Sequence, residues 1–333
     1  MPFFFSRPTL KIAIVGCGAV GSYYGAKLAR DGHDVHFLLR GDYEVVRASG
    51  VRVMSDGESF TVRPRCAREP GEIGVCDLVL IALKTTANSE FSRLLPPLVA
   101  AHTAVMTLQN GLGNEAALAR VVPAAKVLGG LCFVCLNRIQ PGVIQHIAHG
   151  KVVIGEFQRG PEPRTHDLCT SFKHAGIPSK VAENLERAHW EKLVWNIPFN
   201  GLGVAGTAGY EAWGGPPDTG ASRHSVVLTT DILLGDPRWE RIVRALMAEV
   251  IATANALGHP IPESHADRNI ANTRTMGAYR ASTLIDFECG RPLELQSLFL
   301  EPLRRARAAA VATPVLERLC DTLLALDARR ATA

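Results

Sequence analysis

A glycine triplet near the start of the chain has the spacing of a phosphate-binding turn. Gly16, Gly18 and Gly21 directly follow the short apolar run Lys11–Val15, and helical spacing over residues 22–30 begins immediately after them. In this strand, turn and helix context the glycines allow a tight turn and a close approach of a pyrophosphate, whose charge the helix N-terminus stabilises. We therefore predict a dinucleotide site here; a purely structural turn is the alternative.

The residue at the end of the expected second strand discriminates between the two nicotinamide dinucleotides. An NAD site usually has Asp or Glu at this point, to accept a hydrogen bond from the ribose 2′-hydroxyl. This chain has Arg40 there. A guanidinium cannot accept that bond, but its donors match a 2′-phosphate, so we expect NADPH. The alternative is a solvated Arg40, with the nearby Asp42 bonding the ribose.

A polar stripe in the second half of the chain could bind a reacting group. Lys192, Asn196 and Asn200 stand four residues apart in an otherwise apolar segment, so a helix would place them on one face. An otherwise apolar helix with such a polar stripe has something polar to bind. The alternative is a solvated lysine beside asparagines that cap or connect helices. Pro198 is expected to kink this helix.

The elements that would position the glycine turn alternate between strands and helices. Short apolar runs predict strands over residues 11–15, 34–40, 78–83 and 104–108, and helical stretches separate them. This alternation predicts a parallel sheet with right-handed crossovers. Lys84 follows the third run, so we expect it at the edge where such sheets bind ligands. A solvated lysine at a helix start is the alternative.

The rest of the chain divides into a β-rich and a helical part. A hairpin is expected around Asp56 and Gly57, between residues 51–53 and 59–62, and further strands over 127–136, 142–146, 152–154 and 177–181. Helical patterns follow over 186–200, 239–257, 278–286, 295–310 and 314–328, with a loop at 214–217. We therefore predict an α/β Rossmann-type domain with a parallel sheet over residues 1–183 and an all-helical domain over residues 184–333.

Composition limits the function further. The 333 residues suffice for two domains, and the net charge of +4 is spread without the single-sign block of a nucleic-acid arm. No apolar run is long enough for a membrane span or a secretory signal, so we expect a cytoplasmic protein with no membrane partner. The eight cysteines are scattered without the spacing of a disulfide framework, so we expect them to be reduced thiols. Cys132 and Cys135 form a lone C-x-x-C without a second ligand pair, so no metal site is expected.

The complete set of motifs resembles the ketopantoate reductase family, whose members reduce 2-dehydropantoate with NADPH on the route to pantothenate and coenzyme A. The resemblance extends from Lys11 to about Leu326. Several separated motifs in the right order are more specific than any one of them. They are Gly16-Cys17-Gly18-Ala19-Val20-Gly21, Arg40, Leu83-Lys84-Thr85, Gln109-Asn110-Gly111-Leu112-Gly113, Trp190-Glu191-Lys192-Leu193, Asn196, Asn200, Ser282-Thr283-Leu284, Asp286, Gly290-Arg291-Pro292 and Glu294.

The resemblance implies a role for each candidate residue. Lys192 would be the general acid that bonds the keto oxygen, and Glu294 would orient it. The substrate's carboxylate and hydroxyl groups would be held by Asn110, Asn196, Asn200 and Ser282. The cofactor would contact Gly16, Gly18, Ala19, Val20, Gly21, Arg40, Lys84 and Asn110.

The chain departs from the family pattern after Glu294. The family often has an acidic residue two places on and then an Asn-Gly pair, whereas this chain has Gln296 and Phe299-Leu300. The segment from 212 to 234 also looks longer and more irregular than its usual counterpart. These changes fall in the predicted substrate domain. They leave the identity of the 2-keto acid open.

Three hypotheses therefore remain, together with a weaker fourth. The first is a ketopantoate reductase, and the second is a reductase of another small branched or hydroxylated 2-keto acid on the same scaffold. The third is a module that binds NADPH without turnover, against which Lys192 and Glu294 argue. The fourth, a dehydrogenase based on His189, has weaker support because that residue reads as an ordinary, partly buried histidine. The oligomeric state stays open, a homodimer included.

Overall fold

The computed structural model describes residues 9–210 and 227–332, which form two compact units. Unit 1 runs to Asn110 and continues over Asn114–Leu185. Unit 2 comprises Gly111–Gly113 and begins again at Glu186. The loop expected at 214–217, and most of the irregular segment 212–234, lie outside the described residues.

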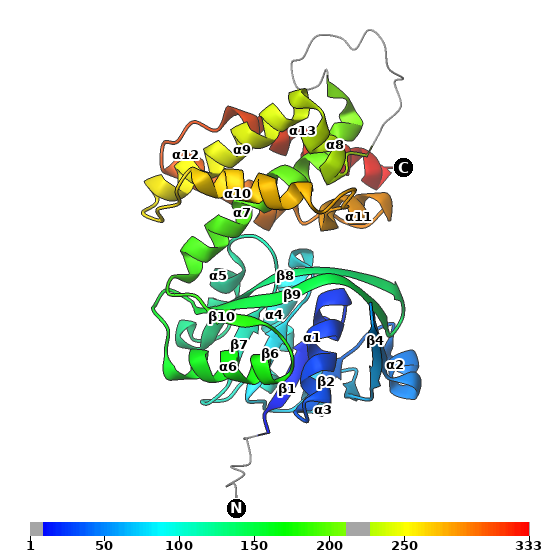
Figure 1. The fold of residues 1–333 in the computed structure, drawn as a ribbon. Helices are drawn as coiled ribbons and strands as arrows, with labels where there is room; N and C mark the ends of the chain where they lie inside the picture. Colours follow the sequence, from blue (N-terminus) through cyan, green and yellow to red (C-terminus); the bar gives the residue numbers. More distant parts are fainter. Residues whose placement is uncertain (1–8, 211–226, 333) are drawn as a thin grey trace, which may run out of the picture. The chain divides into compact units, whose positions relative to one another are not determined.

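Unit 1 is built on a mostly parallel sheet (Figure 1). Among the described residues it has ten strands in the order β4-β3-β9-β8-β7-β6-β1-β2-β5, with β10 beside β9. The pairs β3–β4 and β8–β9 are antiparallel, and the remaining pairs are parallel. The strands are β1 (Lys11–Val15), β2 (Asp34–Leu38), β3 (Val51–Ser55), β4 (Glu58–Val62), β5 (Arg65–Ala67), β6 (Leu78–Ile81), β7 (Ala104–Thr107), β8 (Val127–Gln140), β9 (Val143–Glu156) and β10 (Ser179–Val181).

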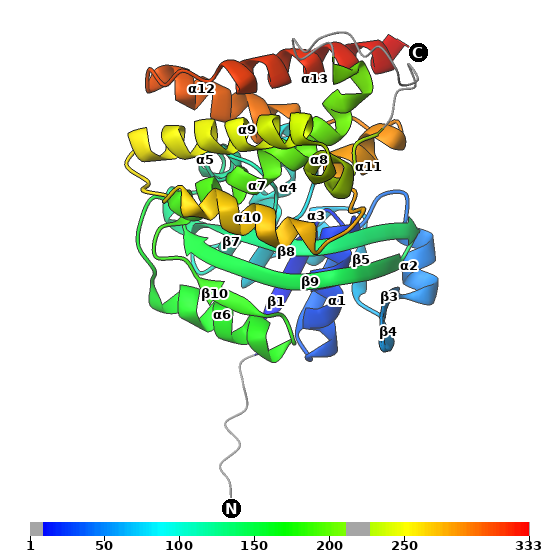
Figure 2. The same ribbon diagram turned by 45° about the horizontal axis from the view of Figure 1, so that its top comes forward.

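Helices cover both faces of this sheet, which is why its central strands are continuous apolar runs. Ile12 and Ile14 of β1 pack in the core that includes α1 and α6, whereas Ala13 and Val15 pack in the core on the opposite face. Figure 2 shows α6 beside β10. The helices of unit 1 are α1 (Ala19–Arg30), α2 (Tyr43–Ser49), α3 (Pro70–Ile73), η1 (Thr85–Glu90), α4 (Phe91–Leu94), η2 (Pro96–Leu98), α5 (Asn114–Ala119), η3 (Ala124–Lys126) and α6 (Pro163–His174).

The long β8–β9 hairpin differs from the expectation of several short strands. Residues 142–146 and 152–154 were expected to form separate strands, but both belong to β9. Three register shifts along the pair accommodate extra residues, as β-bulges do, without ending the pairing. His149 lies in this stretch with a positive φ of 66°. Two long strands therefore replace the broken β pattern that the sequence indicated.

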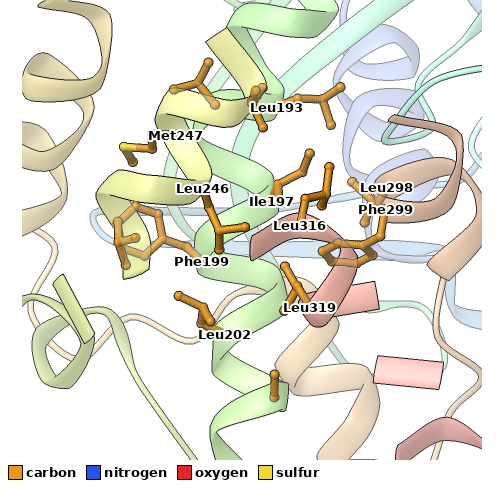
Figure 3. Packing of buried hydrophobic residues seen from close by; sticks show 14 of the residues in the cluster. Leu193, Ile197, Phe199, Leu202, Leu246, Met247, Leu298, Phe299, Leu316 and Leu319 are labelled. Atoms are coloured by element: carbon orange, nitrogen blue, oxygen red, sulfur yellow. The ribbon is translucent and has the colours of Figure 1, made fainter. Parts of the chain in front are cut away.

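Unit 2 is helical, and its core is arranged around α7. The hydrophobic side chains of α7 from Leu193 to Ala205 are buried except for Trp195, which packs against the same core from a partly buried position, as expected for the central helix of a bundle. Figure 3 shows Ile197 and Phe199 among side chains from α9, η6 and α13. The helices are α7 (Leu185–Ala205), η4 (Gly206–Ala208), α8 (Thr230–Gly235), α9 (Pro237–Ala256), α10 (Ser264–Arg274), α11 (Ser282–Glu288), η6 (Gln296–Leu300), α12 (Glu301–Ala308) and α13 (Pro314–Thr332).

The predicted fold class is confirmed: a mostly parallel α/β sheet is followed by a helical region. Several details of unit 2 differ from the expectation. The helix α10 was not expected, and the helix expected over 278–286 begins at Ser282 as α11. The single helix expected over 295–310 is a π-helical turn, η6, followed by α12. The helix with the polar stripe, expected to end at residue 200, continues to Ala205 with Pro198 inside it, and the kink expected at Pro198 stays a prediction. No described helix combines the length and the hydrophobicity that crossing a lipid bilayer requires.

A buried ion cluster connects β9 with the start of α6. The Glu156 side chain is fully buried, and its carboxylate accepts hydrogen bonds from Arg164 at 2.6 Å and Thr165 at 2.6 Å, and from Arg159 at 3.1 Å. Burial opposes ionisation, but these donors outweigh it, so the Glu156 pKa is lowered from its usual value. The cluster thereby fixes where α6 begins.

The substitution Glu156→Gln should destabilise the protein, because glutamine loses the charge that both arginines bind. We expect a loss of about 1–3 kcal/mol at neutral pH, less than for a fully buried pair, because each arginine side chain is 31% exposed. Since the folded pKa is lowered, this stability is fully present above the unfolded pKa of about 4.3 and is lost as pH falls through the folded pKa.

Urea unfolding of wild type and Glu156→Gln over a pH series measures the difference between their free energies of unfolding. The difference between wild type and Glu156→Gln should shrink toward acidic pH. Glu58→Gln is the control, because it breaks an exposed pair with Arg30 and should change stability little. A stability difference between wild type and Glu156→Gln that is independent of pH would contradict the stabilising role of the ionised Glu156 carboxylate.

Candidate active site

Each glycine of the triplet occupies a position with its own geometric requirement. Gly16 has a φ of +102°, and a Cβ on it would lie 2.3 Å from the Leu83 nitrogen. A Cβ on Gly21 would lie 2.1 Å from the Gly16 oxygen. A Cβ on Gly18 would meet nothing within 4 Å. The turn thus combines a tight bend, close packing of helix on strand and open space, which are the three features that a pyrophosphate cradle needs.

The predicted cofactor residues of unit 1 follow neighbouring parallel strands. The glycine turn follows β1, Arg40 follows β2, Lys84 follows β6, and Asn110 follows β7. Because these strands are parallel and in register, their carboxyl ends lie along one edge of the sheet. Such an edge is where α/β sheets bind ligands. Ala19 and Val20 begin α1 at the same edge.

Arg40 and Asp42 differ in their surroundings. Arg40 is exposed, and its guanidinium makes no hydrogen bond or ion pair with any other described residue. The Asp42 carboxylate, in contrast, is 17% exposed and accepts a hydrogen bond from Arg138 at 2.6 Å. An anionic ligand at the end of β2 would therefore meet one available guanidinium and one carboxylate that already has a cationic partner.

A network of buried and half-buried side-chain amides fixes the loop that contains Asn110. Gln109 donates to the Asn88 side chain at 2.7 Å, and Asn88 donates to the Asn114 side chain at 3.0 Å. Asn114 in turn donates to the Asn110 carbonyl oxygen at 3.0 Å. The network joins η1, which begins after Lys84, to the loop after β7. Sequence analysis missed Asn88 and Asn114, because only Gln109 belonged to a motif.

The polar stripe of α7 has a buried end and a more accessible end. Asn196 and Asn200 are 5% and 3% exposed, while Lys192 is half-buried. The side-chain amide oxygen of Asn200, Oδ1, accepts from the Ser282 hydroxyl and the Thr283 backbone N–H, each at 3.1 Å. Asn200 thus caps α11 from a neighbouring helix, which is the connecting role considered for these asparagines. Ser282 keeps hydroxyl lone pairs that can accept a further bond.

Glu294 is buried and stands just before the π-helical turn η6. In this turn Gln296 accepts from the Glu301 N–H, five residues on, and Ser297 uses its carbonyl oxygen to accept from the Leu112 N–H at 2.9 Å. Gly111 lies against the same peptide, so that a Cβ there would be 2.3 Å from the Ser297 oxygen. The Gly111–Gly113 motif therefore packs on the turn that follows Glu294.

The residues that depart from the family pattern have different environments in η6. Gln296 is exposed, whereas Phe299 is fully buried and belongs to the core of unit 2. Phe299 and Leu319 approach α7 closely at Gly201, where a Cβ would lie 3.0 Å and 2.6 Å from them. Phe299 thus supports α7 at Gly201, while Leu300 packs on the same core from a partly buried position.

Comparison with known proteins gives one consistent family. The family models that match are those of ketopantoate reductase PanE/ApbA, over residues 12–159, and its C-terminal region, over residues 225–327. A 2-dehydropantoate 2-reductase of Nostoc sp. is 38% identical over 328 residues, which are 97% of each chain.

Solved structures agree over the same extent. The 2-dehydropantoate 2-reductase of Geobacter metallireducens has a TM-score of 0.87 and 42% identity, covering 95% of this chain and 99% of its own. That of Methylococcus capsulatus has a TM-score of 0.84 and 34% identity, covering 97% and 99%. Since these similarities span the glycine turn as well as the helical region, the chain belongs to the ketopantoate reductase PanE/ApbA family.

Proposed function

We propose that this protein catalyses the NADPH-dependent reduction of 2-dehydropantoate to pantoate, a step toward pantothenate and coenzyme A. The observation that carries the proposal is the 38% identity to a 2-dehydropantoate 2-reductase along 97% of the chain. The candidate residues from both units, including Lys192 and Glu294, lie within this extent. The reaction assigns each of them a chemical task.

The residues of unit 1 fit a phosphorylated dinucleotide. The open space at Gly18 leaves room for the pyrophosphate beside the start of α1, and the Arg40 guanidinium is available for a 2′-phosphate. Bound NADPH would supply the hydride. Lys84 and Asn110 are assigned to the same cofactor, since both follow strands that end at this edge.

Lys192 is assigned the proton transfer. Hydride addition to a ketone carbon leaves negative charge on the oxygen, so a proton must arrive there. The Lys192 Nζ would bond this oxygen and donate its proton, while the buried Glu294 carboxylate would act as the positioning group. A general acid on a helix that is buried along most of its length is held rigidly, which favours alignment.

Amide and hydroxyl groups are assigned to the substrate. Asn110, Asn196, Asn200 and Ser282 offer uncharged donors and acceptors, which suit a hydroxylated acid. The side-chain oxygen of Asn200 already accepts from the Thr283 N–H of α11, so we assign its side-chain NH2 group to the substrate.

A second candidate, a reductase of another small 2-keto acid, is favoured by one observation. Phe299, in the segment where the chain departs from the family, packs against α7 at Gly201, and Leu300 packs on the same core. We retain a small-molecule 2-keto acid as the substrate class in either case. A cytoplasmic enzyme without nucleic-acid or membrane partners, as a monomer or a homodimer, stays a prediction.

Comparison of two keto acids tests the proposed substrate. With NADPH, kcat/KM for 2-ketopantoate should exceed that for 2-ketoisovalerate, which lacks the 4-hydroxyl, by at least about tenfold, because one lost hydrogen bond leaves buried polar groups unpaired. Steady-state NADPH oxidation measures both values under one set of conditions. A higher value for the deshydroxy acid would replace the first candidate by the second, and no turnover of any keto acid would favour a binding module.

The substitution Arg40→Ala tests the cofactor assignment. Losing a charge-assisted hydrogen bond should weaken NADPH binding by roughly one to two orders of magnitude and leave NADH nearly unchanged. Titration with each cofactor measures the two dissociation constants. Arg47→Ala, which removes an exposed arginine from α2, is the control. Equal losses for both cofactors would refute the assignment.

The substitution Lys192→Ala tests the proton donor. We expect kcat to fall by roughly 10²–10⁴ while NADPH still binds, because the phosphate cradle is in the other unit. Glu294→Ala should also lower kcat/KM, and the double variant should be no worse than Lys192→Ala if the two act together. Arg187→Ala, an exposed cation on the same helix, is the matched control. A near-normal kcat in Lys192→Ala would contradict the role.

A further inference from the structure

The corner between β2 and α2 contains a carboxylate where a 2′-phosphate is expected. The Tyr43 N–H donates to the Arg40 carbonyl oxygen at 3.3 Å, so residues 40–43 form one turn. Asp42 lies in this turn at the N-cap position, immediately before α2, but its side chain makes no capping hydrogen bond there. Arg40 and Asp42 therefore have opposite charges within a single turn.

The negative charge of Asp42 acts electrostatically on Cys17 in the glycine turn. Burial raises the pKa of the Cys17 thiol well above its usual value, and Cys66 and then Asp42 raise it further. Cys17 stands between Gly16 and Gly18, and its thiol donates to the Leu38 carbonyl oxygen at 3.4 Å. An uncompensated Asp42 would thus repel the phosphates of a bound dinucleotide.

Arg138 compensates this charge from the other half of the sheet. It stands near the end of β8, and its guanidinium donates to Asp42 at 2.6 Å. The turn of the β8–β9 hairpin contacts both β3 and α2. Gly142 accepts from the N–H of Arg52 in β3 at 2.8 Å, and a Cβ on Gly142 would lie 3.5 Å from Val46 of α2. Figure 1 and Figure 2 show this end of the hairpin beside α2.

We propose that Arg138, through its ion pair with Asp42, makes the β2–α2 corner selective for the 2′-phosphate of NADPH. The pair offsets the charge of the Asp42 carboxylate and occupies its Oδ1, so that this carboxylate is a poorer acceptor for the 2′-hydroxyl of NADH than the unpaired carboxylate of an NAD site. Arg138 is thus a positioning residue that acts through Asp42. The inference rests on the proposed function, which assigns NADPH to this edge.

The test measures dissociation constants of NADPH and NADH by calorimetry, with the full chain and no keto acid present. Arg138→Gln should weaken NADPH by roughly tenfold and bind NADH as well as or better than wild type, because the freed carboxylate repels a phosphate but accepts from a hydroxyl. The double variant Arg138→Gln with Asp42→Asn no longer has the carboxylate through which Arg138 acts. Its NADPH dissociation constant should therefore lie within about threefold of that of Asp42→Asn alone, and any improvement in NADH binding caused by Arg138→Gln should disappear.

Two controls separate this effect from general charge and from misfolding. Arg68→Gln removes a cation that pairs with Glu44 of α2 at 2.8 Å, and it should leave the ratio of the two affinities unchanged. Thermal melting reports folding, and an ion pair as exposed as Arg138–Asp42 should contribute little to it. If Arg138→Gln fails to fold, Arg138→Lys should keep the NADPH preference, whereas a loss of that preference would overturn the proposal.

Each remaining outcome decides for or against the inference. If Arg138→Gln leaves the ratio of the NADPH and NADH affinities unchanged, the proposal is overturned. It is also overturned if Arg138→Gln weakens NADPH binding equally in the wild-type background and in the Asp42→Asn background, because Arg138 would then be a direct ligand. The proposed function is tested separately by wild type and Arg40→Ala. If wild type prefers NADPH, Arg40→Ala loses that preference and Arg138→Gln keeps it, only the inference about Arg138 fails. If wild type binds neither cofactor, the inference and the proposed function both fail.

Discussion

The backbone of Gly21 lies so close to the Gly16 carbonyl that a Cβ on Gly21 would be 2.1 Å from the oxygen. Any side chain there would push α1 away from the end of β1. With none, the helix starts directly at the edge where β2, β6 and β7 also end, and the space beside Gly18 stays open. The cofactor assignments of Arg40, Lys84 and Asn110 all depend on this one close contact, because it places a helix N-terminus at their edge of the sheet.

Buried polar links fix the ends of the other elements. Glu156 holds the start of α6, the Gln109–Asn88 bond holds the loop after β7, and Asn200 caps α11. A buried hydrogen bond contributes modestly, but a buried polar group left without a partner is costly, so each link favours one arrangement over its alternatives. The apolar cores supply most of the stability of both units, while these links determine where loops and helix ends lie. The candidate groups are placed mainly at such ends.

At the β2–α2 corner both carboxylates are paired with arginines. Glu44 and Asp42 of this corner each have an arginine partner, while the Arg40 guanidinium has none among the described residues. The partner of Asp42 comes from a hairpin whose turn is packed on α2. A widely used α/β fold can thus be adapted to one cofactor by a few side chains around a single turn, without altering the sheet that positions them.

Short-range patterns were sufficient for the fold class and for the strand ends at which the candidate residues of unit 1 lie. The glycine spacing, the apolar strands and the helical periodicity depend on neighbours within a few residues, so the sequence by itself determined the sheet, the helical second half and the edge to which Arg40 belongs. Tertiary structure decided the rest. Only folding brings Arg138 to Asp42 across 96 positions, joins Asn200 to α11, and turns the segment after Glu294 into a π-helical turn. No local rule encodes these contacts, because each depends on which distant surfaces pack together and on where buried polar atoms find partners.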